Sequence, residues 1–301
     1  MTERIEIVEV GPRDGLQNEQ TVLSVEDRVA FVRRLEAAGA RRIETVSFVN
    51  PRRVPQMAHS AEVCAALPHE DGRTRIGLVL NMRGWDDAVA TGVDEANVVV
   101  CASDGFGIRN QGASVEQQLE TALAIAERAK TEGPPLSATV SVAFGDPFDG
   151  EVPRERVVGI VRDLAEAGVR EIALGDTIGV ADPWTTRRMV EAVRTAAPDV
   201  SFRLHFHDTR RAALANAYAG IEAGVRVLDA SCGGIGGCPF APNATGNLAT
   251  EDLVYALHRA GFETGYDLDA LIETAFWIGD KLGKAPPSAL TRAGPFPRHK
   301  E

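Results

Sequence analysis

Two histidines separated by one residue are the most informative chemical feature of the chain. His205 and His207 close a short apolar run that has the composition of a β-strand. Residues i and i+2 of a strand point to the same face, so both imidazoles can converge on one ion. A pair of hydrogen-bonded core histidines would give the same pattern. Carboxylates at other predicted strand ends favour a metal site, because this ligand mixture suits Mg²⁺ or Mn²⁺ with open positions.

A carboxylate that could complete this set follows the first predicted strand. The segment Gly11-Pro12-Arg13-Asp14-Gly15 begins where that strand ends, Glu44 lies in the second strand, and Asp176 ends the sixth. In parallel barrels the chemistry is built at the carboxyl ends of the strands. We therefore treat Asp14 as the candidate third ligand.

The placement of lysine excludes one class of carbon–carbon chemistry. The chain contains Lys130, Lys281, Lys284 and Lys300, and none of them lies on a predicted strand. A Schiff-base aldolase needs a desolvated lysine at the reacting carbon. Carbon–carbon chemistry in this protein would therefore use a metal ion instead.

A glycine-rich segment with a cysteine at each end follows the eighth predicted strand. It runs from Cys232 to Cys238 and contains four glycines, which permit the backbone changes of a closing loop. Pro239 stands where a dinucleotide fingerprint would need its third glycine. A flexible surface loop with an incidental thiol is the alternative interpretation. Thr250 is predicted to cap the next helix, which would hold Asn247 and Glu251 beside the barrel mouth.

Short β-branched runs alternate with helix-period segments along the chain. The runs cover residues 5–11, 42–49, 75–80, 96–102, 137–144, 171–176, 201–207 and 226–231. The helical segments between them include residues 25–38, 115–130, 154–167, 185–196 and 209–223, and 253–260 follows the last run. This alternation predicts a (β/α)8 TIM barrel. We expect one catalytic domain over residues 1–301, with the barrel at about 5–262 and a helical extension and tail at about 263–301.

Composition limits the partners of the protein. The 32 Lys and Arg residues against 43 Asp and Glu give a net charge of -11, which argues against nucleic acid or an anionic membrane as the main partner. The four cysteines form no CxxC pair, so reduced thiols in the cytoplasm are expected. The first residues leave no room for a secretory leader, and no apolar stretch is long enough to span a bilayer.

Arginines follow several of the predicted strands. A solvated rim would explain any one of them, whereas their shared position suits an anionic substrate with phosphate or carboxylate groups. They are Arg52, Arg53, Arg83, Arg109, Arg210 and Arg211.

Six motifs in order closely resemble the hydroxymethylglutaryl-CoA lyase family, within the metal-dependent barrel lyases and synthases. The resemblance runs from about residue 5 to 282, and its motifs lie at residues 11–19, 43–49, 174–179, 205–209, 236–239 and 246–252. It implies cleavage of 3-hydroxy-3-methylglutaryl-CoA to acetyl-CoA and acetoacetate, assisted by Mg²⁺ or Mn²⁺. It also implies a place in leucine degradation and ketone body metabolism.

The resemblance also implies roles for individual residues. The metal ligands map to Asp14, His205, His207 and Asn247. Arg13 would face the thioester carbonyl, Glu44 would hold Arg13, and Cys238 would be the thiol that protonates carbon. Either Asp14 or His205 could remove the hydroxyl proton. The predicted catalytic residues are Arg13, Glu44, His205, Cys238 and Glu251, and the predicted substrate contacts are Arg13, Gln17 and Asn110.

Departures from the family pattern concern the substrate. Val142 and Asp146 stand where relatives often carry cysteine, and Ser103-Asp104 replaces the more usual Ser-Glu pair. A lyase for another 3-hydroxyacyl-CoA, with a longer branch or a shorter diacid, is therefore the nearest alternative. A Claisen-type acyl-CoA synthase and a catalytically silent metal- or CoA-binding barrel are the others. We expect an acyl-CoA substrate and a homo-oligomer, namely a dimer formed through the apolar C-terminal helix.

Overall fold

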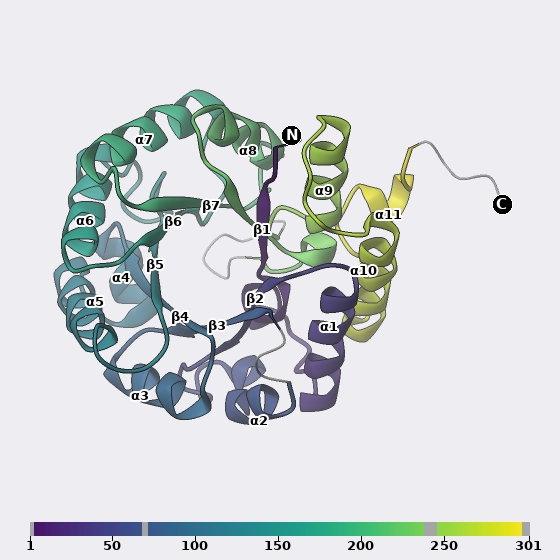
Figure 1. The fold of residues 1–301 in the computed structure, drawn as a ribbon, viewed down its shortest axis with the longest axis horizontal. Coiled ribbons are helices and arrows are strands. Elements are labelled where there is room, and N and C mark those ends of the chain that lie inside the picture. The colour runs from purple at the N-terminus through teal and green to yellow at the C-terminus, as the bar shows by residue number, and fades with distance from the viewer. Residues whose placement is uncertain (1–2, 68–71, 238–245, 297–301) are drawn as a thin grey trace.

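Eight parallel strands form a closed barrel in which each strand pairs with the next and β8 pairs with β1 (Figure 1). The computed structural model describes residues 3–67, 72–237 and 246–296. The strands are β1 (Glu6–Glu9), β2 (Arg42–Ser47), β3 (Thr74–Val79), β4 (Glu95–Cys101), β5 (Leu136–Ser141), β6 (Glu171–Asp176), β7 (Ser201–Phe206) and β8 (Val227–Ala230). The predicted TIM barrel is confirmed.

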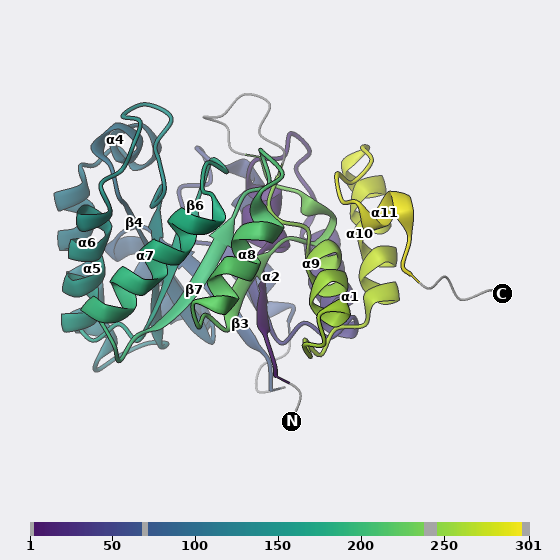
Figure 2. The same ribbon diagram turned by 90° about the horizontal axis from the view of Figure 1, so that it is seen from above.

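Helices surround the barrel and carry the chain back between consecutive strands (Figures 1 and 2). They are α1 (Val25–Ala37), α2 (Ser60–Ala65), α3 (Met82–Thr91), α4 (Asp104–Gln111), α5 (Val115–Ala129), α6 (Arg154–Glu166), α7 (Pro183–Ala196), α8 (Ala213–Glu222), α9 (Thr250–Arg259), α10 (Leu268–Leu282) and α11 (Leu290–Ala293). Three single turns are η1 (Gly11–Gly15), η2 (Pro55–Met57) and η3 (Cys232–Gly234). The main core lies between the strands and these helices, where Phe31, Leu35 and Trp85 are fully buried.

The C-terminal extension packs on the first helix. Phe31 of α1 stacks on Trp277 of α10 with ring centroids 6.1 Å apart, and Lys281 pairs with Asp27 at 2.7 Å. On the inner side, the Cys232 thiol at η3 donates to the Leu271 carbonyl at 3.7 Å. The C-terminal extension therefore packs against the first helix, α1, and against η3, the turn that follows β8. None of the helices in the described ranges is long and apolar enough to cross a membrane.

Three helix starts differ from the sequence-based predictions. Helix α7 begins at Pro183 instead of residue 185. Helix α8 begins at Ala213 instead of residue 209, because Arg211 has a left-handed φ of 57° and Asp208 accepts a hydrogen bond from the Ala213 amide at 3.2 Å. Helix α9 begins at Thr250 itself with Ala249 as the N-cap residue, so the predicted Thr250 cap is wrong. The Thr250 hydroxyl instead donates to the buried Glu9 carboxylate at 2.7 Å.

Candidate active site

The turn η1 brings Arg13 and Asp14 over the end of the barrel. This five-residue π-helical turn follows β1 directly, and the Gly11 amide donates to the Glu9 side chain at 2.8 Å. At Gly15 a Cβ atom would stand 2.7 Å from the Ile235 side chain, closer than real Cβ contacts allow. Glycine is therefore required where this turn meets the loop that follows β8.

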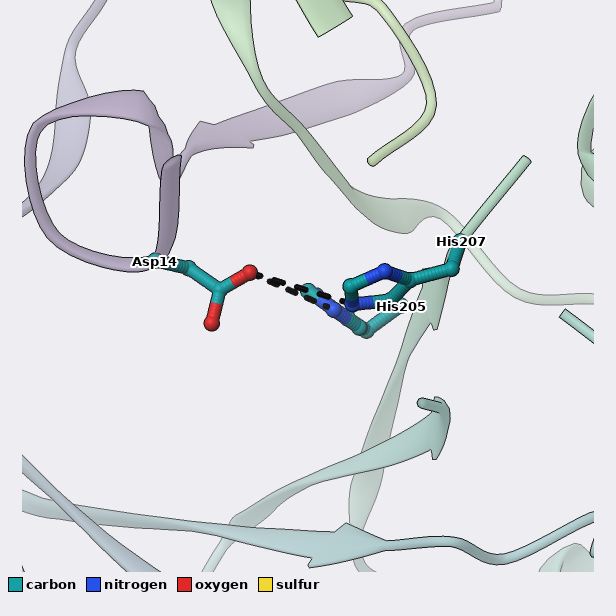
Figure 3. Close-up of side chains that lie close together, drawn as sticks. All are labelled: Asp14, His205 and His207. Atoms are coloured by element: carbon teal, nitrogen blue, oxygen red, sulfur yellow. Dashed lines mark ion pairs between the residues drawn. The ribbon is translucent and has the colours of Figure 1, made fainter. Parts of the chain in front are cut away.

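Asp14, His205 and His207 converge on one point (Figure 3). The Asp14 Oδ2 atom lies 3.9 Å from the Nε2 atoms of both histidines, and one ligand atom from each residue lies within 4.8 Å of the others. The separations from Asp14 exceed hydrogen-bond distance. Asp14 and His205 are partly exposed and His207 is buried, so the ligand atoms are accessible from the pocket.

Asn247 supports the fit of a divalent ion to this cluster. Its Nδ2 donates to Asp14 Oδ2 at 2.7 Å and to the Ile235 carbonyl at 3.1 Å. Its Oδ1 atom is buried and has no hydrogen-bond partner within the described part of the chain. Buried polar atoms without partners are uncommon in native proteins. Two imidazoles, a carboxylate and an amide oxygen form a donor set that suits Mg²⁺ or Mn²⁺.

The electrostatics of the cluster favour neutral His207 and ionised Asp14. Burial, followed by the charge of His205, lowers the pKa of His207 to about 4. Burial alone would raise the pKa of Asp14, but Arg13 and the two histidines outweigh it and hold that pKa well below its ordinary value. Both groups are therefore in their metal-binding forms at neutral pH.

Asp229 orients His205 from behind. The Asp229 Oδ2 atom lies 3.1 Å from His205 Nδ1, and its Oδ1 atom lies 3.2 Å from Nε of Arg203. Burial lowers the pKa of His205, but the hydrogen bond to Asp229 and the charge of Asp14 raise it above its ordinary value overall. A carboxylate on the second imidazole nitrogen fixes the tautomer and ring orientation of a metal ligand. The sequence analysis missed Asp229; a carboxylate within the apolar eighth strand was the available signal.

A pair of carboxylates holds Arg13. Its Nε donates to Glu44 Oε2 at 2.7 Å, its Nη2 lies 2.6 Å from the same atom, and its Nη1 donates to Asp14 Oδ1 at 2.7 Å. These partners outweigh burial and raise the pKa of Arg13. The guanidinium group is thus charged and held in one orientation beside the histidine cluster, as the expected Glu44–Arg13 contact requires.

These groups surround a pocket of about 130 Å³ at the end of the barrel. Arg13, Asp14, Glu44, His205 and His207 line it, together with the predicted substrate contacts Gln17 and Asn110. Its opposite wall is apolar and is formed by Leu78, Leu80, Val99 and Phe106. Among the described residues, no lysine lines the pocket.

Glu251 lies outside this pocket lining. Its side chain is fully buried, and both carboxyl oxygens accept a hydrogen bond from the Gly233 amide, at 3.1 and 3.0 Å. Gly233 has a φ of 76° at the root of the glycine-rich loop. Glu9 holds the same turn, since it accepts from the Cys232 amide at 2.9 Å. The structure therefore places Glu251 as a residue that holds the loop, whereas Cys238 itself lies outside the described residues.

Comparisons with known proteins agree with this architecture. The family model described as HMGL-like matches residues 4–278. The chain is 41% identical to the 3-hydroxy-3-isohexenylglutaryl-CoA/hydroxy-methylglutaryl-CoA lyase of Pseudomonas aeruginosa, over 97% of this chain and 98% of that protein. It is also 41% identical to the (R)-citramalyl-CoA lyase of Chloroflexus aurantiacus, over 97% and 96% of the two chains.

A solved structure of a related lyase has the same fold as this chain. The structure of an HMG-CoA lyase from Acinetobacter baumannii in complex with coenzyme A and 3-methylmalate superimposes with a TM-score of 0.94. The two chains are 34% identical, and the match covers 99% of this chain and 97% of that one. The conserved fold and the nearly complete coverage show that this chain belongs to the HMGL-like family.

Proposed function

We propose that the protein is a carbon–carbon lyase that cleaves 3-hydroxy-3-methylglutaryl-CoA to acetyl-CoA and acetoacetate with a bound Mg²⁺ or Mn²⁺. The convergence of Asp14, His205 and His207 beside the charged Arg13 carries this proposal. Asn247 would be the fourth protein ligand. When bound, a divalent ion would make the tertiary hydroxyl of the substrate more acidic and orient the bond to be broken.

The chain itself supplies the proton transfers and the charge stabilisation. Asp14 or His205 accepts the hydroxyl proton as the hydroxyl oxygen becomes the ketone oxygen of acetoacetate. The C2–C3 bond breaks, and its electron pair remains on the acetyl-CoA fragment as an enolate. Arg13 stabilises the enolate oxygen as a fixed cation. The Cys238 thiol then donates a proton to the C2 carbon, which completes acetyl-CoA.

The Glu44 carboxylate contributes to this reaction by holding Arg13 in one orientation. A guanidinium group that is already held by two carboxylates loses little freedom when the enolate oxygen forms. Glu44 contacts Arg13 at 2.7 Å from within β2 and is 4% exposed. We assign Glu44 as the residue that keeps Arg13 aimed into the pocket, and Gln17 and Asn110 as neutral polar contacts to the substrate.

A lyase for a related 3-hydroxyacyl-CoA is the second candidate, because the names of two relatives include a longer branch and a shorter diacid. Val142 and Asp146, the residues that depart from the family pattern, do not line the pocket. Asp146 is buried, accepts a hydrogen bond from Ser103 and from the Phe148 amide, and so ties two barrel loops together. The apolar wall is the part of the pocket that limits the size of the 3-substituent.

The first experiment is acetyl-CoA release by metal-stripped protein, with and without Mg²⁺ or Mn²⁺. Hydroxymethylglutaryl-CoA, citramalyl-CoA and a 3-isohexenyl analogue are compared at equal concentration. Metal-dependent turnover with the highest kcat/KM for hydroxymethylglutaryl-CoA supports the proposal. Preference for another thioester selects the second candidate, and no lyase activity with metal bound refutes both.

Matched variants test the metal site in the same assay. Asp14→Asn removes a ligand charge, whereas Asp199→Asn removes the same charge from an exposed position before β7. We expect Asp14→Asn to lose metal binding in calorimetry together with turnover. Normal metal affinity in Asp14→Asn would remove Asp14 from the ligand set.

We further propose that the protein acts on its acyl-CoA substrate in the cytoplasm, in leucine degradation and ketone body metabolism, without nucleic acid or membrane partners. The net charge of -11 supports the exclusion of polyanionic partners. The proposed homo-oligomer would form through α10, where Phe276 is 48% exposed. Light scattering on the purified protein and on Phe276→Glu tests the oligomer; a monomer in both cases contradicts it.

A further inference from the structure

Helix α4 is a short part of the pocket wall that its own sequence supports poorly. It follows β4 and lies at the face of the barrel where the strands end (Figure 2). Two of its eight residues are glycines, which lower helix propensity. Phe106, Asn110 and Gln111 of this helix line the catalytic pocket. The shape of the pocket on this side therefore depends on contacts that hold α4 from outside.

Asp146, in the loop that follows β5, contacts the first turn of α4 twice. Its Oδ2 atom accepts hydrogen bonds from the Phe106 amide at 3.0 Å and from the Ser103 hydroxyl. Ser103 is the N-cap residue of α4, and its oxygen accepts from the Phe106 amide at 3.4 Å. Because the hydroxyl proton points to Asp146, the lone pairs of Ser103 stay turned toward the helix. One carboxylate oxygen thus accepts from the helix directly and orients its cap.

The position of Asp146 is itself fixed. Its Oδ1 atom accepts from the Phe148 amide at 2.6 Å, and its backbone pairs with Gly150 at 2.8 and 3.0 Å. At the beginning of the loop, Val142 has a left-handed φ of 50°, and its amide donates to the Thr177 hydroxyl at 2.9 Å. This conformation is an outlier for a β-branched residue, and it persists only where the surroundings determine it. The loop is therefore a rigid support for α4.

A second carboxylate of the same loop contacts α4 at a more exposed place. Asp149 accepts from the Gly105 amide at 2.7 Å, and its side chain is exposed. Water can replace an exposed acceptor, so the loss of Asp149 costs little. The hydrogen bond between Asp146 and the Phe106 amide is different, because both residues are buried. Asp146 is therefore the acceptor on which the start of α4 depends.

We propose that Asp146 determines which 3-substituent the pocket accepts, because it holds Phe106 in the apolar wall. This inference rests on the proposed 3-hydroxyacyl-CoA substrate and names a residue that selects among such substrates without touching them. The pocket measures about 130 Å³. In so small a space, a displacement of one aromatic ring changes the room for a side branch substantially. Asp146 is thus a positioning residue, and Phe106 is the group that meets the branch.

Selectivity between a short and a long branch tests this assignment. The kcat/KM is measured for 3-hydroxy-3-methylglutaryl-CoA and its 3-isohexenyl analogue with the wild type, Asp146→Asn and Phe106→Ala. Asparagine has the shape of aspartate but turns an NH₂ group toward one of the two amides, which leaves a buried donor without an acceptor. We expect each variant to shift the ratio of the two kcat/KM values about tenfold toward the longer branch. Asp163→Asn, an exposed position on α6, should leave the ratio unchanged.

A double variant shows whether Asp146 acts through Phe106. If it does, Asp146→Asn adds no further shift once Phe106→Ala is present, whereas additive shifts would overturn the proposal. Ser103→Ala gives a second approach to the same contact and replaces Asp146→Asn if that variant does not fold. It removes the cap and keeps the acid, so we expect a smaller shift in the same direction. An unchanged ratio in Asp146→Asn, or in Ser103→Ala where it is the replacement, would also overturn the proposal.

Hydrogen exchange on metal-free and substrate-free protein measures the support of α4 directly. We expect the α4 amides, with that of Phe106 among them, to exchange about fivefold faster or more in Asp146→Asn than in the wild type and Asp163→Asn. Equal exchange rates would refute the support of α4 by Asp146. Faster exchange with an unchanged kcat/KM ratio would make Asp146 a purely structural residue and refute its role in selectivity.

A binding measurement separates this proposal from the proposed function. Calorimetry with 3-hydroxy-3-methylglutarate and its 3-isohexenyl analogue, in the presence of Mg²⁺, needs no coenzyme and no turnover. We expect Asp146→Asn to lose binding selectivity between the two acids, as it loses kinetic selectivity. This loss in a protein without lyase activity would refute the proposed reaction and keep the role of Asp146. Equal selectivity in the wild type and Asp146→Asn would refute that role.

Discussion

Substitution of Glu251 by glutamine separates a positioning role from a proton-transfer role for this buried carboxyl group. Burial is the main cause that raises the pKa of Glu251 from 4.5 to about 8. The group is therefore largely protonated and neutral at pH 7. Glutamine has the same shape and also presents a carbonyl oxygen, so it can accept the hydrogen bond from the Gly233 amide that Glu251 accepts.

The magnitude of the effect follows from proton linkage. Because the folded pKa of Glu251 lies above the unfolded value, the native state holds a proton that the unfolded state releases. Its stabilisation is complete below the unfolded pKa and is lost as the pH rises through the folded pKa. Integration between pH 5 and pH 8 gives a loss on the order of 3 to 4 kcal/mol in the wild type. Glu251→Gln lacks this contribution, whereas the raised pKa of Glu9 affects both proteins and cancels in their difference.

Urea unfolding of metal-free protein at pH 5, 6, 7 and 8 measures this difference. Glu222→Gln is the control, because Glu222 is exposed at the end of α8. We expect the wild type and Glu222→Gln to lose stability in parallel and Glu251→Gln to lose less. Parallel curves for all three proteins would refute an uncharged Glu251. Turnover at pH 7 completes the test: a proton-transferring Glu251 predicts a loss of about 10²- to 10⁴-fold in Glu251→Gln, whereas a positioning role predicts less than tenfold.

Three further substitutions address the site directly. Arg13→Gln should lower kcat about 10²- to 10³-fold, because it removes the fixed cation at the enolate oxygen; an unchanged kcat would exclude this role. Asp229→Asn should weaken Mn²⁺ binding about 10- to 100-fold, because His205 loses its carboxylate partner; calorimetry with unaltered affinity would contradict it. Cys238→Ser should keep metal affinity and lose most turnover, whereas full activity in that variant would assign the proton donor to another group.

The sequence predicted the barrel well because its local signals agree with its tertiary pairing. Gly39, Gly168 and Gly224 follow predicted helices, and all three adopt positive φ angles of 106°, 105° and 97°. Helix α4 was missed, since two glycines in eight residues weaken its local propensity. Contacts from outside the helix stabilise it, including the hydrogen bond from the Gly105 amide to Asp149 at 2.7 Å.

The candidate site also contains some contacts that the sequence predicts and others that it does not. The spacing of His205 and His207 places both side chains on one strand face, and the structure brings Asp14 to them. No local pattern assigns Asp229 to His205, because the contact joins neighbouring strands across 24 residues of chain. Glu9 gives a similar case, since its donors come from three separate segments of the chain: Gly11, Cys232 and Thr250. Predicting such partners requires the barrel register as well as the strand pattern.

Buried charge continues below the site and explains how one orientation of His205 is kept. Arg203 links Asp229 to Glu171, at 3.2 and 3.4 Å, and Arg42 links Glu171 to Glu95, both at 2.7 Å. Such pairs add little net stability, because the cost of desolvation offsets the attraction. Their effect is directional: rotation of Asp229 away from His205 would leave the buried Arg203 without one of its two acids. The barrel interior thus restricts Asp229 and, through it, the His205 imidazole that lines the pocket.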